Sequence, residues 1–284
     1  MVESKQEWKD IIKDHPVIIS ATPRLTFAKA VALFHSRQPE NVVAVTGTNG
    51  KSSTVSFFRQ IGHILGLQTA SIGTLGVYTQ EKINFPDVSL TTPTSLTTHI
   101  ILEELDALKI THAAMEASSH GLDQYRIHGV NIKAAAFTNF TQDHLDYHGS
   151  MSEYFNAKMK LFTQVLKPGS FAVLNTDIPE YETISQLCLE HDLKILSYGK
   201  NGRDVKIVNS TFQDRKQVVT LEILGIRQTI ELSLFGEFQL YNVLTAFGLM
   251  MACGIAAEKL IGCIPKLKGI DGRMEFAGKT ASGC

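Results

Sequence analysis

The sequence predicts an α/β fold, with a mainly parallel sheet flanked by helices and a small antiparallel β appendage. Up to about Lys194, short apolar runs alternate with segments whose apolar residues recur at helical spacing. This alternation is typical of βαβ units and a parallel sheet. After about Lys194, three short β-rich runs with a period of two follow one another, which is typical of antiparallel strands.

The parallel part is expected to begin with the buried strand NVVAVTG, which ends at a glycine-rich loop. A helix is expected before this strand, roughly from Thr26 to Ser36, and another from Ser52 onward. Further strands are expected in GLQTASIGT, THAAMEAS, KAAAFTNF and SFAVLNTD. Further helices are expected in PTSLTTHIILEELDALKI, with a proline near its first turn, and in SMSEYFNAKMKLFTQVL, with a Ser cap.

The appendage is expected to consist of VKIVNSTF, QVVTLEIL and RQTIELSLF. Two helices, FQLYNVLTAFGLMMAC and AAEKLIGCIPKL, follow these strands. The final segment, GIDGRMEFAGKTASGC, is rich in Gly, Ser and Thr, and this composition is typical of the start of a linker.

The composition is that of an ordinary globular protein, with 284 residues, 44% hydrophobic and 19% charged. The net charge of −1 and the lack of a Lys/Arg-rich run argue against a nucleic-acid partner. No run of 18 apolar residues is present, so no membrane span is expected, and the polar N-terminus does not resemble a signal peptide. Four widely spaced cysteines indicate reduced thiols and a cytoplasmic protein.

The loop GTNGKSS is a candidate phosphate-binding loop. Gly47 and Gly50 allow backbone N–H groups to turn inward, Lys51 adds a positive charge, and the following helix adds its dipole. A hydroxyl of Ser52 or Ser53 can bind Mg²⁺. The alternative is a glycine-rich turn with a surface lysine, but the strand before the loop and the helix after it favour phosphate binding.

The segment MEASSHGLDQYRI carries a second candidate site. Glu116 stands at the end of a predicted strand, where ligands of open α/β sheets bind, and a carboxylate there can hold Mg²⁺. Arg126 can hold a carboxylate or phosphate through two hydrogen bonds. The alternative is a polar loop with a surface salt bridge.

The segment TQDHLDYHG carries two histidines four residues apart, His144 and His148. No Glu follows the first of them as in H-E-x-x-H, so a magnesium or phosphate role for His144 is favoured over a zinc pair. Lys158 lies on the following helix, at a position where a lysine usually extends along the surface. Thr91 and Thr92 precede another predicted helix and either bind a carboxylate or phosphate or cap that helix.

Taken together, these motifs identify a resemblance to a known family. VTGTNGKSS, TTPT, MEASSHGLDQYR, TNFTQDHLDYHGSMSEYFNAKMKLF, GEFQLYNVLTA and GRMEFAG stand in the order found in the Mur ligases. The chain closely resembles the UDP-N-acetylmuramoyl-dipeptide ligases, from about Val17 to its last residue. This family uses the shorter loop G-T-x-G-K-[ST], so Val45 in place of the usual P-loop glycine is no defect.

The resemblance implies an ATP-dependent ligase of peptidoglycan synthesis that adds the third amino acid to UDP-N-acetylmuramoyl-L-alanyl-D-glutamate. ATP phosphorylates the free carboxylate of the D-glutamate, and the amino group of the incoming amino acid attacks the acyl phosphate. The implied cofactors are ATP, Mg²⁺ and CO₂ as a lysine carbamate. The implied protein is a cytoplasmic monomer.

The resemblance also implies roles for individual residues. Lys51 matches the contact to the β- and γ-phosphates, Lys158 matches a lysine that carries the carbamate, and the matched metal ligands are Ser52, Glu116, His144 and carbamylated Lys158. The nucleotide positions are Gly47, Thr48, Asn49, Gly50, Lys51, Ser52, Ser53, Asn242 and Arg273. The muramoyl-dipeptide positions are Thr91, Thr92, Ser118, Gln124 and Arg126. Gln239 stands where the family favours Asn, so we expect the adenine-side contact from Asn242 instead.

The implied domain division is a remnant of an N-terminal uridine-binding domain (1–40), a central ATP-binding domain (41–270) and the start of a hinge to a missing C-terminal domain (271–284). Two alternatives remain open. The isolated chain is a Mg-ATP-binding fragment without turnover, or the enzyme is a folylpolyglutamate-synthetase-like ligase. The segments SSHGL and DHLDYHG favour the tripeptide synthetase.

Overall fold

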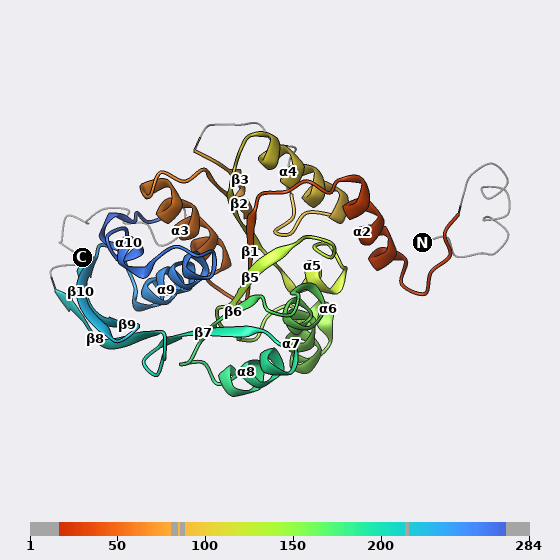
Figure 1. The fold of residues 1–284 in the computed structure, drawn as a ribbon. Helices are drawn as coiled ribbons and strands as arrows, with labels where there is room; N and C mark the ends of the chain where they lie inside the picture. Colours follow the sequence, from red (N-terminus) through yellow and green to blue (C-terminus); the bar gives the residue numbers. More distant parts are fainter. Residues whose placement is uncertain (1–16, 81–84, 86–88, 214–215, 271–284) are drawn as a thin grey trace, which may run out of the picture.

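A computed structural model describes residues 17–80, 85, 89–213 and 216–270 of the chain (Figure 1). The described strands form one sheet in the order β10-β9-β8-β7-β6-β5-β1-β4-β2-β3. The strands are β1 (Asn41–Thr46), β2 (Thr69–Gly73), β3 (Gly76–Tyr78), β4 (His112–Glu116), β5 (Ile132–Phe137), β6 (Phe171–Asn175), β7 (Lys194–Gly199), β8 (Val205–Gln213), β9 (Lys216–Ile223) and β10 (Ile226–Leu232).

The sheet is parallel through its middle and antiparallel at both ends. Strands β2, β4, β1, β5, β6, β7 and β8 pair in parallel with their neighbours. Strand β3 pairs antiparallel with β2 at one edge, and β8, β9 and β10 form the antiparallel end at the other edge. The predicted fold class is therefore confirmed, and the appendage is a continuation of the main sheet.

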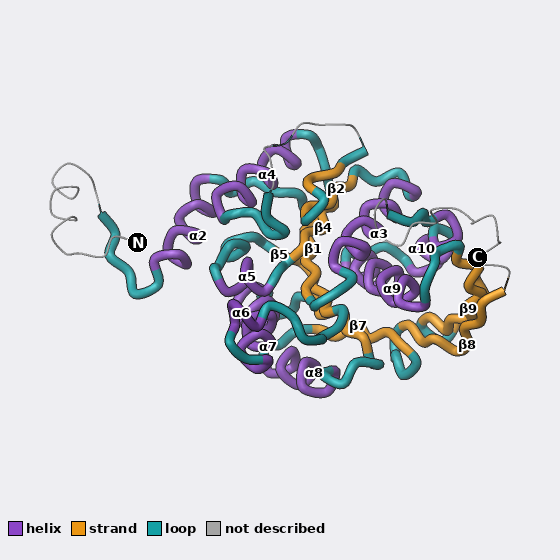
Figure 2. Tube along the Cα trace, turned by 180° about the vertical axis from the view of Figure 1, so that it is seen from behind, coloured by secondary structure: helices purple, strands orange, loops and turns teal. Residues whose placement is uncertain are grey.

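Helices cover both faces of the sheet (Figures 1 and 2). α3, α9 and α10 lie on the side toward which β8–β10 curve, and α4, α7 and α8 lie on the opposite side. The described helices are α2 (Pro23–Phe34), α3 (Lys51–Ile64), α4 (Ser95–Ala107), α5 (Ser119–Asp123), α6 (Leu145–His148), α7 (Met151–Lys160), the π-helical turn η1 (Leu161–Val165), α8 (Tyr181–Glu190), α9 (Glu237–Ala252), α10 (Ala257–Ile261) and the 3₁₀ turn η2 (Ile264–Lys266).

The apolar sequence of β1 follows from its place in the middle of this sandwich. Val43 and Val45 belong to the core that contains α3 and α9, and Val42 and Ala44 belong to the core on the other face. Every residue of β1 is buried, because successive side chains point to opposite faces and both faces are covered. A continuous apolar run is what such a strand requires.

The order of the strands creates a crevice at the carboxyl end of β1. The chain leaves β1 through α3 toward β2 on one side, and it leaves β5 through α6 and α7 toward β6 on the other side. β1 and β5 are neighbours, so the two connections separate at their carboxyl ends. Open α/β sheets bind ligands at such switch points.

Most predicted elements are confirmed, but some differ from the prediction. α2 begins at Pro23 instead of near Thr26, because proline is well accommodated in the first helical turn. α8 was not predicted, and neither was β7, which pairs in parallel with β6 and extends the parallel part beyond Lys194. The predicted Ser cap is confirmed, because Ser150 Oγ accepts from the amide of Glu153 at 3.2 Å.

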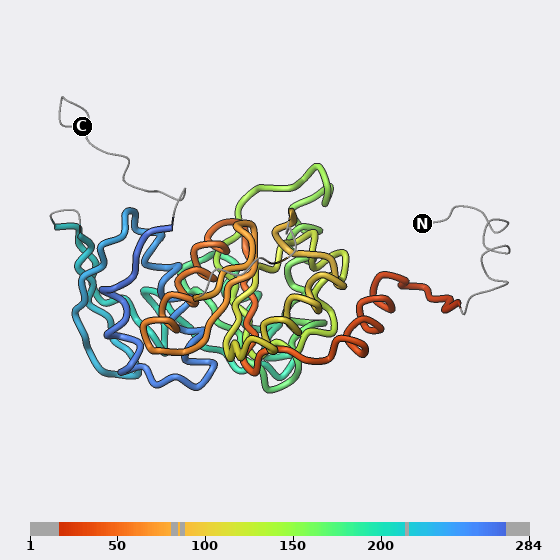
Figure 3. Tube along the Cα trace, turned by 90° about the horizontal axis from the view of Figure 1, so that it is seen from above, coloured from red at the N-terminus to blue at the C-terminus, as the bar shows by residue number. Residues whose placement is uncertain are grey.

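The predicted domain division is not tested by the structure, because both ends of the chain lie outside the described residues. α2 lies at one side of the body, where it packs against α4 (Figure 3). Residues 1–16 and the predicted hinge 271–284 lie outside the described residues.

None of the helices in the described part combines the length and the apolar character needed to cross a membrane. Cys188, Cys253 and Cys263 are buried free thiols, and Cys284 lies outside the described part.

Candidate active site

The candidate phosphate-binding loop GTNGKSS (residues 47–53), called the phosphate loop below, joins β1 to α3 and lies in the crevice at the switch point. Gly47 and Gly50 have positive φ angles of 134° and 87°, which side chains rarely adopt. A Cβ atom at Gly47 would collide with Thr138 Oγ1, and one at Gly50 would collide with Asn242 Oδ1. The two glycines therefore let the loop pack against the end of β5 and against α9.

The segment after β5 holds the loop in place. Asn139 accepts a hydrogen bond from the amide of Asn49 through Oδ1 and one from the amide of Thr48 through its carbonyl oxygen, each at 2.9 Å. Thr138 Oγ1 donates to the Asn49 carbonyl oxygen at 2.6 Å. These contacts occupy two loop amides, so the first turn of α3 is left to offer N–H groups to an anion.

Two lysines converge on Gly47 from different helices. Lys51 Nζ donates to the Gly47 and Thr48 carbonyl oxygens at 3.0 and 2.7 Å. Lys158 Nζ donates to the same Gly47 oxygen at 2.8 Å and lies 4.3 Å from the centre of the Tyr154 ring. Lys158 is 1% exposed, so the expectation that a lysine at this position extends along the surface is wrong.

The environment of Lys158 disfavours its charged form. Burial is the main cause that holds the pKa of Lys158 well below its usual value, and the charge of Lys51 acts in the same direction. The carboxylate of Asp143 opposes both effects. A larger share of neutral amine is therefore present at Lys158 than at an exposed lysine.

Glu116 lies at the end of β4, as the sequence predicts, and its carboxylate is held in one orientation. Its Oε1 accepts from the amide of Thr74 at 2.9 Å, and its Oε2 accepts from Thr74 Oγ1 at 3.3 Å. Burial raises the pKa of Glu116, while hydrogen bonds from Thr74 and Ser52 and the charge of Lys51 lower it. The side chain is thus a desolvated, oriented acceptor beside the phosphate loop.

The loop, Glu116 and His144 line one small cleft of about 130 Å³. His144 comes from the N-terminal end of α6, where it has a positive φ of 51°. Its Nε2 lies 3.5 Å from Asp143 Oδ2, and its ring meets His120 edge-on. The residues that line the cleft are Thr48, Asn49, Gly50, Lys51, Ser52, Ser53, Thr74, Thr91, Glu116, Ser118 and His144. Ten of these eleven residues are predicted positions, from four segments of the chain, and Thr74 is the addition.

The oxygen donors of this cleft fit Mg²⁺. Mg²⁺ in phosphoryl-transfer sites takes one or two protein oxygens and completes its shell with water and phosphate oxygens. Glu116 and Ser52 supply such oxygens, whereas the His144 imidazole is a less typical Mg²⁺ ligand. In the described part of the chain, no three His, Cys, Asp or Glu side chains form a group that could hold a metal by themselves.

The first two threonines of TTPTS have different environments. Thr91 lines the cleft, and its Oγ1 accepts from Thr74 Oγ1 at 3.0 Å. Thr92 is fully buried, where its Oγ1 donates to the Glu116 carbonyl oxygen and accepts from the Ser118 amide, each at 2.9 Å. Neither caps α4, because Thr94 does so. Thr92 therefore positions the end of β4.

Gln124 and Arg126 bond to each other. Arg126 Nε and Nη2 both donate to Gln124 Oε1, at 3.2 and 2.7 Å, and Nη1 donates to the Thr92 carbonyl oxygen at 2.8 Å. These acceptors are neutral, so the surface salt bridge considered for Arg126 is not found among the described residues. Arg126 is thus fixed against the side chain of Gln124 and the carbonyl oxygen of Thr92.

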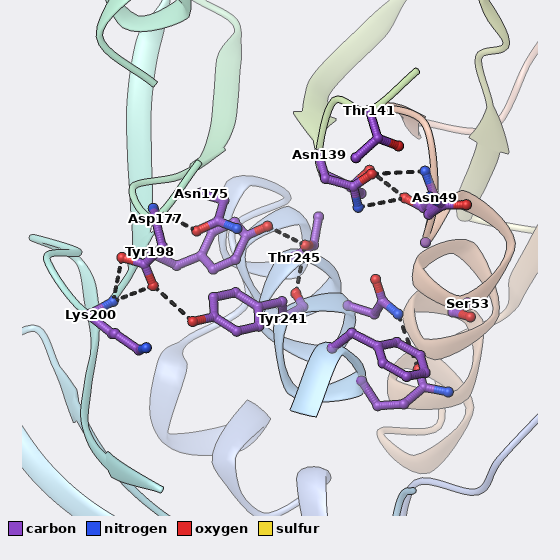
Figure 4. A pocket seen from close by; sticks show the side chains of 15 residues that line it. Asn49, Ser53, Asn139, Thr141, Asn175, Asp177, Tyr198, Lys200, Tyr241 and Thr245 are labelled. Carbon is purple, nitrogen blue, oxygen red and sulfur yellow. Dashed lines mark hydrogen bonds between the residues drawn. The ribbon is translucent and has the colours of Figure 1, made fainter. Parts of the chain in front are cut away.

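A larger pocket of about 750 Å³ opens between the loop and α9 (Figure 4). Asn242 lies in its wall, and its Nδ2 donates to Gln239 Oε1 at 3.1 Å. At the other end, Asp177 accepts from Tyr241 Oη at 2.9 Å and from the amide of Lys200 at 2.8 Å. A volume of this size is typical of small-ligand sites. Predicted Arg273 lies outside the described residues.

Several residues of the site were missed from the sequence, although a signal for them exists. Thr74 directly follows β2, Asn139 stands two residues after β5, and Asp177 stands two residues after β6. Polar residues just after parallel strands gather at one edge of the sheet, so strand ends alone predict them. Tyr154, whose hydroxyl lies 3.3 Å from Thr48 Oγ1, has no comparable signal, because its position depends on how α7 packs.

Comparisons with known proteins agree with this geometry. The family model of the Mur ligase middle domain matches residues 45–250. The UDP-N-acetylmuramoyl-L-alanyl-D-glutamate–2,6-diaminopimelate ligase of Agrobacterium fabrum is 40% identical over 270 residues, which are 95% of this chain and 55% of the relative. The corresponding ligase of a Chelativorans species is 41% identical over 268 residues, 94% of this chain and 55% of the relative. The chain thus spans about half the length of the curated relatives it matches.

Solved structures show the same relationship. A UDP-N-acetylmuramoyl-L-alanyl-D-glutamate–2,6-diaminopimelate ligase superposes with a TM-score of 0.80 at 27% identity, covering 91% of this chain and 53% of that chain. The apo form of L. casei FPGS superposes with a TM-score of 0.67 at 16% identity, covering 92% of this chain and 71% of that chain. The second likeness shows the shared fold alone.

Proposed function

This chain belongs to the Mur ligase middle domain family, and from that premise we propose that it is the ATP-binding part of an amide ligase. The proposed reaction joins 2,6-diaminopimelate to UDP-N-acetylmuramoyl-L-alanyl-D-glutamate, as the names of the relatives state for them. The proposed setting, cytoplasmic peptidoglycan synthesis, comes from the family resemblance of the sequence. The observation that carries the proposal is the single cleft in which Lys51, Ser52, Glu116 and His144 meet.

ATP is proposed to lie across the two adjoining cavities. The phosphates take the first turn of α3 and Lys51, where N–H groups and positive charge are concentrated. The base and ribose take the larger pocket beside Asn242, because Asn49, Gly50 and Ser53 line both cavities and connect them. Arg273 remains part of this proposal from the sequence alone.

Ser52, Glu116 and His144 are proposed to hold Mg²⁺ with the help of the phosphates. The ion supplies neutralisation of the charge on the phosphate oxygens. Glu116 contributes a carboxylate that Thr74 has already oriented, so little rearrangement is needed when the nucleotide binds. Thr92 supports this arrangement through the Glu116 carbonyl oxygen.

Lys158 is proposed to be carbamylated. A neutral amine adds to CO₂ and releases one proton, and the product is an anionic carbamate. Burial beside Lys51 supports this chemistry, since it lowers the pKa of the Lys158 ammonium. The carbamate would replace the repulsion between Lys51 and Lys158 with attraction, and its oxygens could join the Mg²⁺ ligands.

The proposed reaction begins with transfer of the γ-phosphoryl group to the free carboxylate of the D-glutamate, which gives an acyl phosphate. The amino group of the incoming amino acid then attacks the acyl carbon, and the tetrahedral intermediate collapses to the amide and phosphate. Thr91, Ser118, Gln124 and Arg126 are proposed to position the muramoyl dipeptide. Their contribution is orientation and charge compensation.

The test is a product assay on the full-length protein. Mg-ATP and UDP-N-acetylmuramoyl-L-alanyl-D-glutamate are supplied with either diaminopimelate or lysine, and the tripeptide is measured by mass spectrometry. We expect tripeptide, ADP and phosphate in equal amounts with diaminopimelate. A product with lysine alone would refute the amino-acid assignment, and turnover only with folate and glutamate would establish the folylpolyglutamate-synthetase-like alternative.

A second candidate function concerns the isolated 284-residue chain. It spans about half the length of its curated relatives. We propose that this chain alone binds Mg-nucleotide weakly and does not form tripeptide. Formation of tripeptide by the purified chain would refute this proposal.

A further inference from the structure

Arg59 on α3 has an unusual environment for an arginine. Its Nε atom is buried without a hydrogen-bond partner, although the side chain as a whole is only partly buried, and no acidic side chain of the described residues forms a salt bridge with it. Its recorded neighbour is the ring of Tyr78, whose centre lies 5.7 Å from the guanidinium carbon. Burial lowers the pKa of Arg59, and the influence of Tyr78 only partly opposes it.

This arrangement is unfavourable unless an anion completes it. A partly desolvated cation with a buried, unpaired N–H group destabilises the folded protein, and buried polar groups are generally paired. The cation–π contact with Tyr78 offsets only part of such a cost. The guanidinium group offers a planar fork that binds carboxylate and phosphate oxygens in pairs.

Arg59 lines a cavity of about 180 Å³. Ser52, Ser56 and Arg59 stand four and three residues apart on α3, so they share one face of the helix. Ser71 and Gly73 of β2 form the facing wall. At about 30 Å³ for each water molecule, the space holds roughly six waters. A small oxyanion fits there, whereas a nucleotide does not.

The cavity adjoins the phosphate cleft, because Ser52 and Glu116 line both. The two cavities therefore lie on either side of the same pair of side chains. Glu116 opposes anion binding by its charge, but hydrogen bonds from Thr74 and Ser52 and the charge of Lys51 already compensate that carboxylate in part. Within the described residues, no carboxylate is among the groups that shift the pKa of Arg59 itself.

We propose that this cavity is a second oxyanion site, in which Arg59 binds one small phosphate or carboxylate with the help of the Ser56 and Ser71 hydroxyls. Orthophosphate is the favoured occupant, because its oxygens can take the guanidinium fork and the serine hydroxyls together. The site itself follows from the environment of Arg59. The proposed function enters at one point only: it would supply the phosphate, as the product released in the adjoining cleft.

The test is calorimetric titration of the 284-residue chain with orthophosphate and, separately, with acetate. Because orthophosphate also binds phosphate loops, the titration uses Lys51→Met as the background. We expect one phosphate site to remain in Lys51→Met, and we expect Arg59→Gln in that background to weaken it at least about tenfold. Arg59→Lys keeps the charge but loses the planar fork, so its phosphate affinity should lie between those of Lys51→Met alone and Lys51→Met with Arg59→Gln.

Three results would decide against the proposal or its favoured occupant. Equal phosphate affinity with and without Arg59→Gln, or no binding of either anion, would overturn the site. Binding of acetate without phosphate would support the site but assign it to a carboxylate. Thermal unfolding of each variant verifies folding. A ligase assay that fails while Arg59-dependent phosphate binding persists would refute only the proposed function.

Discussion

Lys158 Nζ and the carbonyl oxygen of Gly47 are joined by a hydrogen bond of 2.8 Å, so α7 is tied to the first residue of the phosphate loop. The same oxygen also accepts from Lys51 at 3.0 Å. Two ammonium groups around one acceptor repel each other, and one of them is fully buried. The loop is thus held by a contact whose strength depends on the protonation state of Lys158.

Replacement of Lys158 by Met should change stability in a pH-dependent way. The folded state lowers the pKa of Lys158, so between that lowered pKa and the unfolded value near 10.5 the unfolded chain binds more protons. Wild-type stability should therefore rise relative to Lys158→Met as the pH increases through this window, by up to about 1.4 kcal/mol per pH unit. Urea unfolding at pH 7.5 and 9.5, in CO₂-free buffer, measures the difference. An unchanged difference would contradict a lowered pKa.

Replacement of Lys158 by Ala should remove ligase activity in the full-length enzyme, by about 100-fold or more, since an anion near the phosphates is lost. Added short-chain carboxylates should restore part of the activity, because they can occupy the space of the carbamate. Lys167→Ala is the matched control, since Lys167 is exposed and its Nζ donates to Asn131 Oδ1 at 2.9 Å. Full activity of Lys158→Ala would refute the carbamate assignment.

Replacement of Gly47 by Ala should abolish nucleotide binding and lower the free energy of unfolding by about 2 kcal/mol or more. The backbone strain of the positive φ and the collision of the added Cβ with Thr138 Oγ1 act together. Gly66→Ala separates these effects. Gly66 has a positive φ of 76°, but no atom within 4 Å of the added Cβ. We expect Gly66→Ala to cost only about 1–2 kcal/mol and to leave nucleotide binding unchanged. Calorimetry with Mg-ADP measures binding, and equal affinity for the two variants would contradict the role of Gly47.

Replacement of Glu116 by Gln should raise the Mg²⁺ concentration needed for half-maximal activity by about tenfold, because an amide oxygen lacks the charge that holds the ion. The fold should persist, since the amide oxygen can still accept from the Thr74 amide. Burial raises the pKa of Glu116, so at neutral pH the neutral amide should be tolerated at least as well as the carboxylate. Exposed Glu104→Gln is the control, and identical Mg²⁺ profiles for both variants would count against Glu116 as a ligand.

Replacement of Asn242 by Ala should weaken nucleotide binding by about tenfold, as expected for the loss of one polar contact in a pocket. Gln239→Ala should produce a smaller loss, because Gln239 acts by accepting the Asn242 amide at 3.1 Å. The double variant should then lose no more than Asn242→Ala alone. Additive losses would mean that Gln239 contacts the nucleotide itself.

Much of the fold could be predicted because its signals are local. The apolar run of β1, the glycines after it and the helical spacing of α3 are contiguous in the sequence, so their order alone predicts a strand, a loop and a helix. α8 was harder, because the charged and polar residues in YETISQLCLE obscure its periodicity, and only Ile184 and Cys188 are buried. Short β3 depends on pairing with β2, which no local pattern reports.

By itself, the sequence determined the parallel α/β class, the phosphate loop and the candidate residues at the strand ends, because backbone geometry and strand–helix order depend on neighbouring residues. Only the tertiary structure decided which side chains meet. It buried Lys158 against Gly47, placed Asn139 on the loop and left Arg59 unpaired among the described residues. Burial, desolvation and long-range hydrogen bonds depend on how distant segments pack, and the sequence of a single segment does not determine that packing.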